Sequence, residues 1–127
     1  MSLTVTVAEK EPGSFRVTVA GSFDSNTYTV FEEKLKPVLS GKPKSVVVDM
    51  SGVSYISSLG LNTILKTKKA LEALSAALII TKLQPQVKKV FDIVAALPSM
   101  NIFESIEEAD AYLTRMQEEE LKKRKQQ

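Results

Sequence analysis

The 127-residue sequence contains neither cysteine nor histidine, and both absences limit its chemistry. Without cysteine there is no disulfide and no thiolate, which agrees with a reducing compartment. Without histidine the chain lacks the usual general base near neutral pH, and the two commonest transition-metal ligands are both missing. We therefore predict a protein that is not an enzyme and that has neither a metal site nor a cofactor.

Glycine is scarce, with only 5 residues, and no G-x-G-x-x-G or P-loop pattern is available to hold a nucleotide phosphate. The adjacent serines Ser57 and Ser58 lie in neither a G-x-S-x-G nor an S-x-x-K pattern, so nothing marks them as activated nucleophiles. The acidic pairs Glu32–Glu33 and Glu107–Glu108 are neighbours on predicted helices, where adjacent side chains diverge. They are interpreted as solvated helix faces.

Long hydrophobic runs are also absent: none approaches the roughly 18 apolar residues of a membrane span. The opening "MSLTVTVAEK" alternates apolar and polar residues instead of forming a signal-peptide core. The 17 basic and 15 acidic residues are interspersed, giving a net charge of +2 without a concentrated basic patch. We expect a cytoplasmic protein with no nucleic-acid partner and no direct membrane insertion.

What the sequence does contain is a regular succession of strand and helix patterns in a chain long enough for one domain. Alternating residues predict two N-terminal strands, around Leu3–Val7 and Phe15–Val19, joined as a hairpin through Pro12 and Gly13. The consecutive valines Val46–Val48 predict a central strand that is buried on both faces and ends at an acid, Asp49.

Helical spacing marks four further segments. The predicted inward stripes are Tyr28, Phe31, Leu35 and Val38; Leu61, Ile64, Leu65, Lys68, Leu71 and Leu74; Val87, Val90, Phe91 and Val94; and Ile106, Ala109, Tyr112, Leu113 and Met116. A buried strand, "AALIITKL", separates the second and third helices, Pro85 opens the third, and Ile102–Phe103 predicts a short strand before the fourth. Ser105 and Glu108 form a capping-box pattern at the start of that fourth helix. The predicted fold is α/β, with a mostly parallel, mixed sheet, an N-terminal hairpin and about four helices.

The stretch "VVVDMSGVSYISSLGLNTIL" holds the most informative junction, because a strand pattern changes there to a helix pattern. Carboxyl ends of parallel strands are where binding surfaces gather. We expect Ser58 to cap the helix and Gly60 to permit close packing. A serine at an exposed helix start can also carry a phosphate, whose charge the helix dipole favours.

The same residues resemble the STAS domain family of bacterial anti-sigma factor antagonists, in which an apolar strand and an acid precede D-S-S/T-G-L and a helix. "VAGSFDSNTY" resembles the family's G-x-L-D turn, "QPQVKKVFDIVAAL" resembles the segment after the fourth strand, and "IFESIEEADAYL" resembles its closing S-x-x-E-A-x-x-x-L pattern. The resemblance covers nearly all of residues 1–115, which we take as the STAS domain. Residues 116–127 are predicted to be a charged helical extension or tail.

The resemblance implies a partner-switching role in transcription regulation. Such a protein binds an anti-sigma factor with serine kinase activity, is switched off by phosphorylation, and is restored by a serine phosphatase. The family's phosphoacceptor falls on Ser58; Ser57 replaces the acid that usually precedes it, which makes Ser57 the alternative acceptor, and Leu59 stands where a serine often follows. The residues predicted to form the partner-binding surface are Asp24, Tyr55, Ser57, Ser58, Leu59 and Asn62, although Tyr55 equally suits the core.

Two other functions are open at this point. One is a non-phosphorylated STAS interaction subunit of a transporter or stress-signalling complex, which Ser57 in place of the acid favours. The other is a small-ligand or nucleotide-binding module that acts at the same strand ends.

Overall fold

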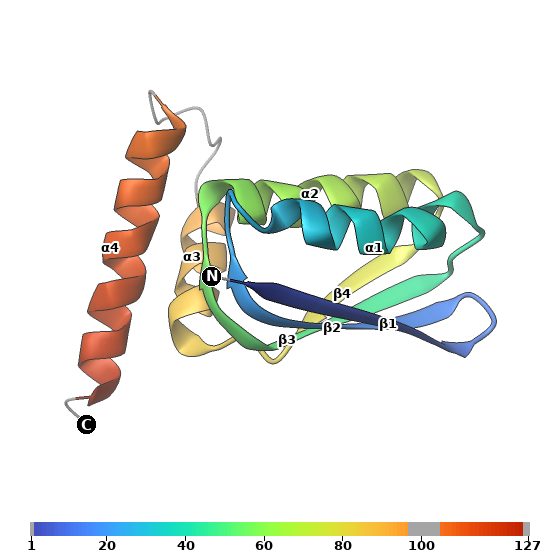
Figure 1. The fold of residues 1–127 in the computed structure, drawn as a ribbon, viewed down its shortest axis with the longest axis horizontal. Helices are drawn as coiled ribbons and strands as arrows, with labels where there is room; N and C mark the ends of the chain where they lie inside the picture. Colours follow the sequence, from blue (N-terminus) through green and yellow to red (C-terminus); the bar gives the residue numbers. More distant parts are fainter. Residues whose placement is uncertain (1, 97–104, 126–127) are drawn as a thin grey trace.

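The computed structural model describes residues 2–96 and 105–125, which form a four-stranded mixed sheet with four helices. The elements in chain order are β1 (Leu3–Glu11), β2 (Ser14–Phe23), α1 (Tyr28–Ser40), β3 (Ser45–Ile56), α2 (Ser58–Ala73), β4 (Ala77–Thr81), α3 (Pro85–Ala96) and α4 (Ile106–Lys125). The strands lie in the order β1-β2-β3-β4. In Figure 1, α1 and α2 lie over one face of the sheet, α3 lies at the end of the sheet beside β3, and α4 lies beyond that end. The predicted fold class is confirmed.

The predicted N-terminal hairpin is present, with β1 antiparallel to β2. Gly13 occupies the turn with a φ of +83°, a conformation that favours glycine, and its N–H donates to Glu9 Oε2 at 3.0 Å. The remaining pairs, β2 with β3 and β3 with β4, are parallel. The chain therefore crosses over the sheet through α1 and then α2.

Strand β3 does not end at Asp49 as predicted, but continues to Ile56. The pairing with β2 shifts at this point, from Thr18 opposite Asp49 to Ala20 opposite Gly52. Asp49 Oδ1 accepts a hydrogen bond from the Ser51 N–H at 2.9 Å, which holds the extra residue in a bulge. The acid thus bends the strand instead of ending it, and β3 delivers Ile56 to the start of α2.

The sheet is packed on one face only over much of its area. Val46 and Val48 are fully buried against the α1 and α2 side, whereas Val47 between them is only half-buried. Strand β4 was predicted to be buried, yet none of its residues is, and Ile79 is 46% exposed. Both predictions of two-sided burial were wrong because the face that carries Val47 and its register partner Ile79 has little covering it there.

The helices bury part of the predicted inward stripes, while Lys68 is exposed and six residues are only partly buried: Tyr28, Leu65, Phe91, Val94, Tyr112 and Met116. Phe31, Leu35 and Val38 of α1, Leu61, Ile64 and Leu71 of α2, Val87 and Val90 of α3, and Ala109 and Leu113 of α4 are all buried. Leu74 was predicted to face inward but is 43% exposed, because α2 ends at Ala73. Pro85 opens α3 as predicted.

Helix α4 begins with the predicted cap, since Ser105 Oγ accepts from the Glu108 N–H at 3.0 Å. It then runs unbroken to Lys125, across the predicted domain boundary between residues 115 and 116. Within the predicted tail, residues 118–124 are mostly exposed, but Met116 is partly buried and Gln117 is 2% exposed, so the first residues of that tail pack against the domain. The short strand predicted at Ile102–Phe103 lies outside the described residues. Among the described residues, no helix is both long and apolar enough to span a membrane.

Candidate functional site

The first turn of α2 is capped by Ser57, not by Ser58 as predicted. Ser57 keeps an extended backbone, with φ −93° and ψ 176°, and its Oγ accepts from the Gly60 N–H at 3.1 Å. Its own N–H donates to the carbonyl oxygen of Phe23 at 2.9 Å, so Ser57 remains part of the strand arrangement. Since β3 extends to Ile56, the first residue outside the strand becomes the cap. The side chain of Ser57 is therefore buried, with the residue 2% exposed.

Ser58 is the first residue of α2 and lies beneath α4. Its N–H donates to Asp110 Oδ1 at 2.8 Å, and its hydroxyl donates to the same oxygen at 2.7 Å. The residue is only 8% exposed, so the expectation of an exposed serine at this helix start was wrong. The cause is α4, whose position over the strand ends no local pattern around Ser58 could indicate.

Gly60 allows α2 to approach the end of β2, as predicted. A Cβ at this position would lie 2.8 Å from a ring carbon of Phe23 and closer still to the Phe23 carbonyl oxygen. The chain on both sides of Ser57 and Ser58 packs against buried residues. The position of the two serines relative to the sheet is therefore fixed.

Helix α4 contributes two further polar side chains to this region. Thr114 Oγ1 lies 2.7 Å from the hydroxyl oxygen of Tyr55, and the Gln117 amide pairs with both backbone groups of Ile56. In that pair the Ile56 N–H donates to Gln117 Oε1 at 3.1 Å, and Gln117 Nε2 donates to the Ile56 carbonyl at 2.8 Å. Gln117 is 2% exposed.

We name Asp110, Thr114 and Gln117 the α4 polar row; none of them was predicted from the sequence to belong to the site. Their spacing of four and three residues places them on one face of α4, beside the buried Ala109 and Leu113. This spacing was the available signal. The spacing alone does not identify a buried contact, because polar residues beside an apolar stripe are usually solvated.

Tyr55 is a residue of β3, and its half-buried side chain contacts α4. Burial raises the pKa of its hydroxyl above the ordinary value of 10.0, and the negative charges of Asp110, Asp24 and Glu118 raise it further, while the hydrogen bond with Thr114 acts in the opposite direction. The three carboxylates therefore face one region, which makes the surroundings of Tyr55 acidic.

Asp24 lies where β2 leaves the sheet, beside the end of β3. Its Oδ2 accepts from the Ser22 hydroxyl at 2.8 Å, and its Oδ1 accepts from the Asn26 N–H at 2.9 Å and from Thr27 Oγ1 at 3.2 Å. The carboxylate thus holds the turn that leads into α1. Four of the predicted partner-binding residues, Asp24, Tyr55, Ser57 and Ser58, are brought together at this end of the sheet.

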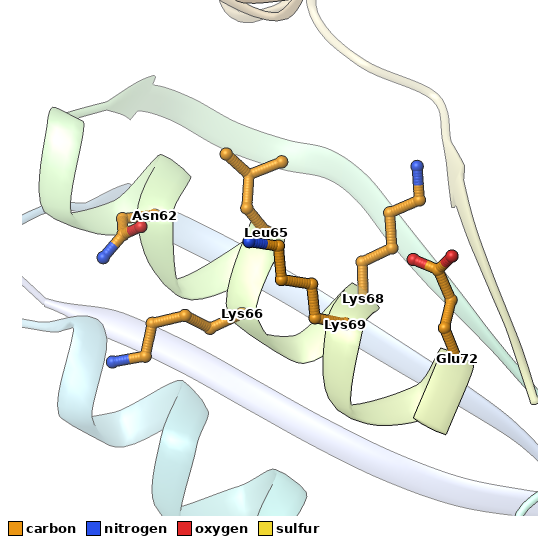
Figure 2. Close-up of a pocket in the computed structure, with 6 residues that line it drawn as sticks. All are labelled: Asn62, Leu65, Lys66, Lys68, Lys69 and Glu72. Atoms are coloured by element: carbon orange, nitrogen blue, oxygen red, sulfur yellow. The ribbon is translucent and has the colours of Figure 1, made fainter. Parts of the chain in front are cut away.

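Leu59 and Asn62 extend the predicted surface along α2. Leu59 is half-buried and Asn62 is exposed. Asn62 also lines a shallow pocket of about 240 Å³ with Leu65, Lys66, Lys68, Lys69 and Glu72. Figure 2 shows that these side chains all come from α2, with Asn62 and Lys66 pointing to the same side. The outer side of α2 is therefore basic, in contrast to the acidic surroundings of Tyr55.

Three glutamines occupy the edge of β3 that β4 leaves unpaired. The pairing of β3 with β4 stops at Asp49 opposite Thr81. Beyond it, Gln84 Nε2 donates to the Ser51 carbonyl at 2.7 Å and Gln86 Nε2 donates to the Ser54 carbonyl at 2.8 Å. Together with Gln117 at Ile56, these side chains replace the backbone groups of a neighbouring strand.

Within residues 2–96 and 105–125, no group of three or more carboxylates comes close enough together to hold a metal ion. The described site is a surface of hydroxyl, carboxylate and amide groups around a helix start.

A protein-family model described as the STAS domain matches residues 6–109. The chain belongs to the STAS domain family. BtrV of Bordetella bronchiseptica is 30% identical to this STAS domain protein over 111 residues, covering 87% of this chain and 93% of BtrV. The anti-sigma-B factor antagonist of Staphylococcus aureus is 29% identical over 93 residues, covering 73% of this chain and 86% of that protein.

Solved structures share the fold of this STAS domain. The anti-sigma factor antagonist SpoIIAA in its unphosphorylated form superimposes with a TM-score of 0.66 at 18% identity, covering 72% of this chain and 81% of that chain. The phosphorylated form of SpoIIAA from Bacillus gives a TM-score of 0.61 at 18% identity, covering 71% and 82%. The family-model match confirms the resemblance inferred from "VVVDMSGVSYISSLGL", and these structures confirm the fold.

Proposed function

We propose that this protein is an anti-sigma factor antagonist that binds an anti-sigma factor through the strand ends around Ser58. The observation that carries the proposal is the match to the STAS domain over residues 6–109, together with a hydroxyl at the first position of α2. The Staphylococcus aureus relative, whose name states this function, aligns over most of both chains. We assign the contact surface to Asp24, Tyr55, Ser57, Ser58, Leu59 and Asn62.

We further propose that the partner is a serine kinase and that Ser58 is its phosphoacceptor. The Ser58 oxygen would attack the γ-phosphorus of ATP, the bond from that phosphorus to the β–γ bridging oxygen would break, and the hydroxyl proton would pass to a base of the kinase. ADP leaves and phosphoserine remains. A serine phosphatase would hydrolyse the ester and return the chain to its binding form.

The contacts of the two serines support Ser58 over Ser57. The Ser57 hydroxyl caps α2 and lies beneath the first turn, so a phosphate there would remove the cap and enter the packed end of β2. The Ser58 hydroxyl instead contacts a side chain of a different element, Asp110 of α4. A phosphate at Ser58 also lies near the N-terminal end of α2, where the helix dipole favours negative charge.

The test compares binding of Ser58→Ala and Ser58→Asp to the anti-sigma factor encoded nearest to this gene. Ser58→Ala should bind at least as tightly as the unchanged protein, and Ser58→Asp at least about tenfold more weakly, because the carboxylate imitates the phosphate charge. Ser54→Asp is the matched control, since it adds the same charge at an exposed position of β3. Equal affinity of the Ser58 variants would refute the switch.

A constitutive interaction subunit of a transporter or stress-signalling complex is the second candidate. The burial of Ser58 under α4 favours it, because a covered hydroxyl is a poor kinase substrate. Under this alternative the two Ser58 variants bind the partner equally, and the protein co-purifies with transporter subunits.

A further inference from the structure

The α4 polar row contacts three residues at the junction between β3 and α2: Tyr55, Ile56 and Ser58. Asp110 accepts from the Ser58 N–H and hydroxyl, Thr114 contacts the Tyr55 hydroxyl, and Gln117 pairs with the backbone of Ile56. We name the surface formed by Tyr55, Ile56 and Ser58 the strand-end surface. Ile56 and Ser58 are buried beneath this helix face and Tyr55 is partly covered by it, so a kinase active site cannot reach the Ser58 hydroxyl while α4 is in place.

The Ser58 hydroxyl is committed as a hydrogen-bond donor to Asp110 at 2.7 Å. A kinase must place its own base at this proton and the phosphorus of ATP at this oxygen. Both requirements conflict with the position of Asp110. The contact therefore blocks the proposed modification chemically as well as sterically.

A phosphate on Ser58 is incompatible with the same contact. Its oxygens would meet the Asp110 carboxylate, whose Oδ1 lies 2.7 Å from the Ser58 hydroxyl oxygen. Like charges at such distances repel strongly in a partly buried site. Once formed, phosphoserine would hold α4 away from the strand-end surface.

Most of the hydrophobic core does not depend on α4. Val17, Val19, Val46, Val48, Phe31 and Leu35 belong to the sheet and α1, and each is at most 1% exposed. Helix α4 contributes Leu113 to the core and packs mainly on α3. Movement of α4 would expose Ala109, Leu113 and the side of α3 that it covers, but the core residues of the sheet and α1 named above would keep their packing.

From these observations we infer that α4 is a latch: it covers Ser58 in the resting protein through Asp110, Thr114 and Gln117, and it must lift before Ser58 is phosphorylated or the strand-end surface is bound. This inference rests on the proposed function, since it names the regulation of the same site. The two states are a closed form, in which Asp110, Thr114 and Gln117 make their contacts, and an open form, in which these three contacts are broken.

The absence of cysteine permits a direct test in the full-length chain without any partner. Ser58→Cys and Asn62→Cys each introduce a single thiol on α2, one beneath α4 and one exposed. Rates of reaction with Ellman's reagent are measured for each folded protein and divided by the rate in denaturant. The Ser58→Cys thiol should react at least about tenfold more slowly than the Asn62→Cys thiol.

Adding Thr114→Ala to Ser58→Cys should raise its reaction rate about fivefold, because one hydrogen bond that closes the latch is lost without any change of charge near the thiol. Glu119→Ala is the control on the exposed side of α4 and should leave the rate unchanged. Equal rates for the two thiols, or no effect of Thr114→Ala, would overturn the latch.

Hydrogen exchange provides a second measurement that needs no thiol. The Ile56 N–H donates to Gln117 and makes no contact with the Ser58 side chain, which contacts Asp110 instead. Ser58→Asp should speed its exchange about fivefold or more if α4 lifts, while amides of Val46–Val48 keep their protection. Unchanged exchange at Ile56 would count against the latch. Because neither measurement involves an anti-sigma factor, their outcome is independent of the binding test of the proposed function.

Discussion

At the scale of single residues, Gly60 sets how closely α2 approaches the sheet. Gly60→Ala should lower the free energy of unfolding by about 1–3 kcal/mol, because the added Cβ meets the ring and the carbonyl oxygen of Phe23. Gly41→Ala is the control: the nearest atoms to its Cβ lie 3.7 Å away, so stability should stay the same or rise slightly. Urea denaturation measures both. Similar losses in the two variants would mean that the contact with Phe23 is not responsible.

The residues at this junction were predictable to different degrees. Ser57, Ser58 and Gly60 stand out because the change from strand to helix pattern is local. Which serine caps α2 was not predictable, since it depends on where β3 ends, and that depends on the bulge at Asp49. The contact between Ser58 and Asp110 joins positions 52 residues apart, and nothing in either local pattern encodes it.

At the scale of elements, the docking of α4 depends on one buried amide. Gln117→Ala should lower the free energy of unfolding by about 2–4 kcal/mol, because the Ile56 N–H and carbonyl both lose their buried partner. Gln84→Ala removes the same kind of bond from an exposed position, where water replaces it, and should cost less than about 1 kcal/mol. Thermal unfolding of the two variants compares them. Equal destabilisation would contradict the importance of burial at Ile56.

The hairpin and the four helices could be predicted because each has a strong periodic pattern with turn or cap residues at its ends. The burial of β4 could not, because an apolar run such as "ALIIT" is compatible with either a covered or an uncovered face. The same ambiguity affected Val47, whose neighbours on both sides are fully buried. Periodicity identifies a strand, but the coverage of its faces is decided by helices elsewhere in the chain.

At the scale of the whole molecule, stability depends on one packed face of the sheet. Val48→Ala should lower the free energy of unfolding by about 2 kcal/mol, because it leaves a cavity between the sheet and α1 and α2. Val47→Ala, the same substitution one residue earlier, should cost less than about 1 kcal/mol because its side chain is only half-buried on the other face. Equilibrium denaturation tests this difference. A cost at Val47 as large as that at Val48 would show that the second face is packed as well.

The glutamines along β3 affect how this fold can diverge. An edge paired by another strand presents the same N–H and carbonyl groups whatever its sequence, so point mutations hardly alter it. Between Ser51 and Ile56 the pairing groups are instead the side chains of Gln84, Gln86 and Gln117. Each can be replaced by a single codon change without rebuilding the sheet. A substitution at any of these glutamines therefore leaves a backbone group of β3 without its present partner, whereas the parallel pairing of β3 with β2 is unaffected by side-chain identity.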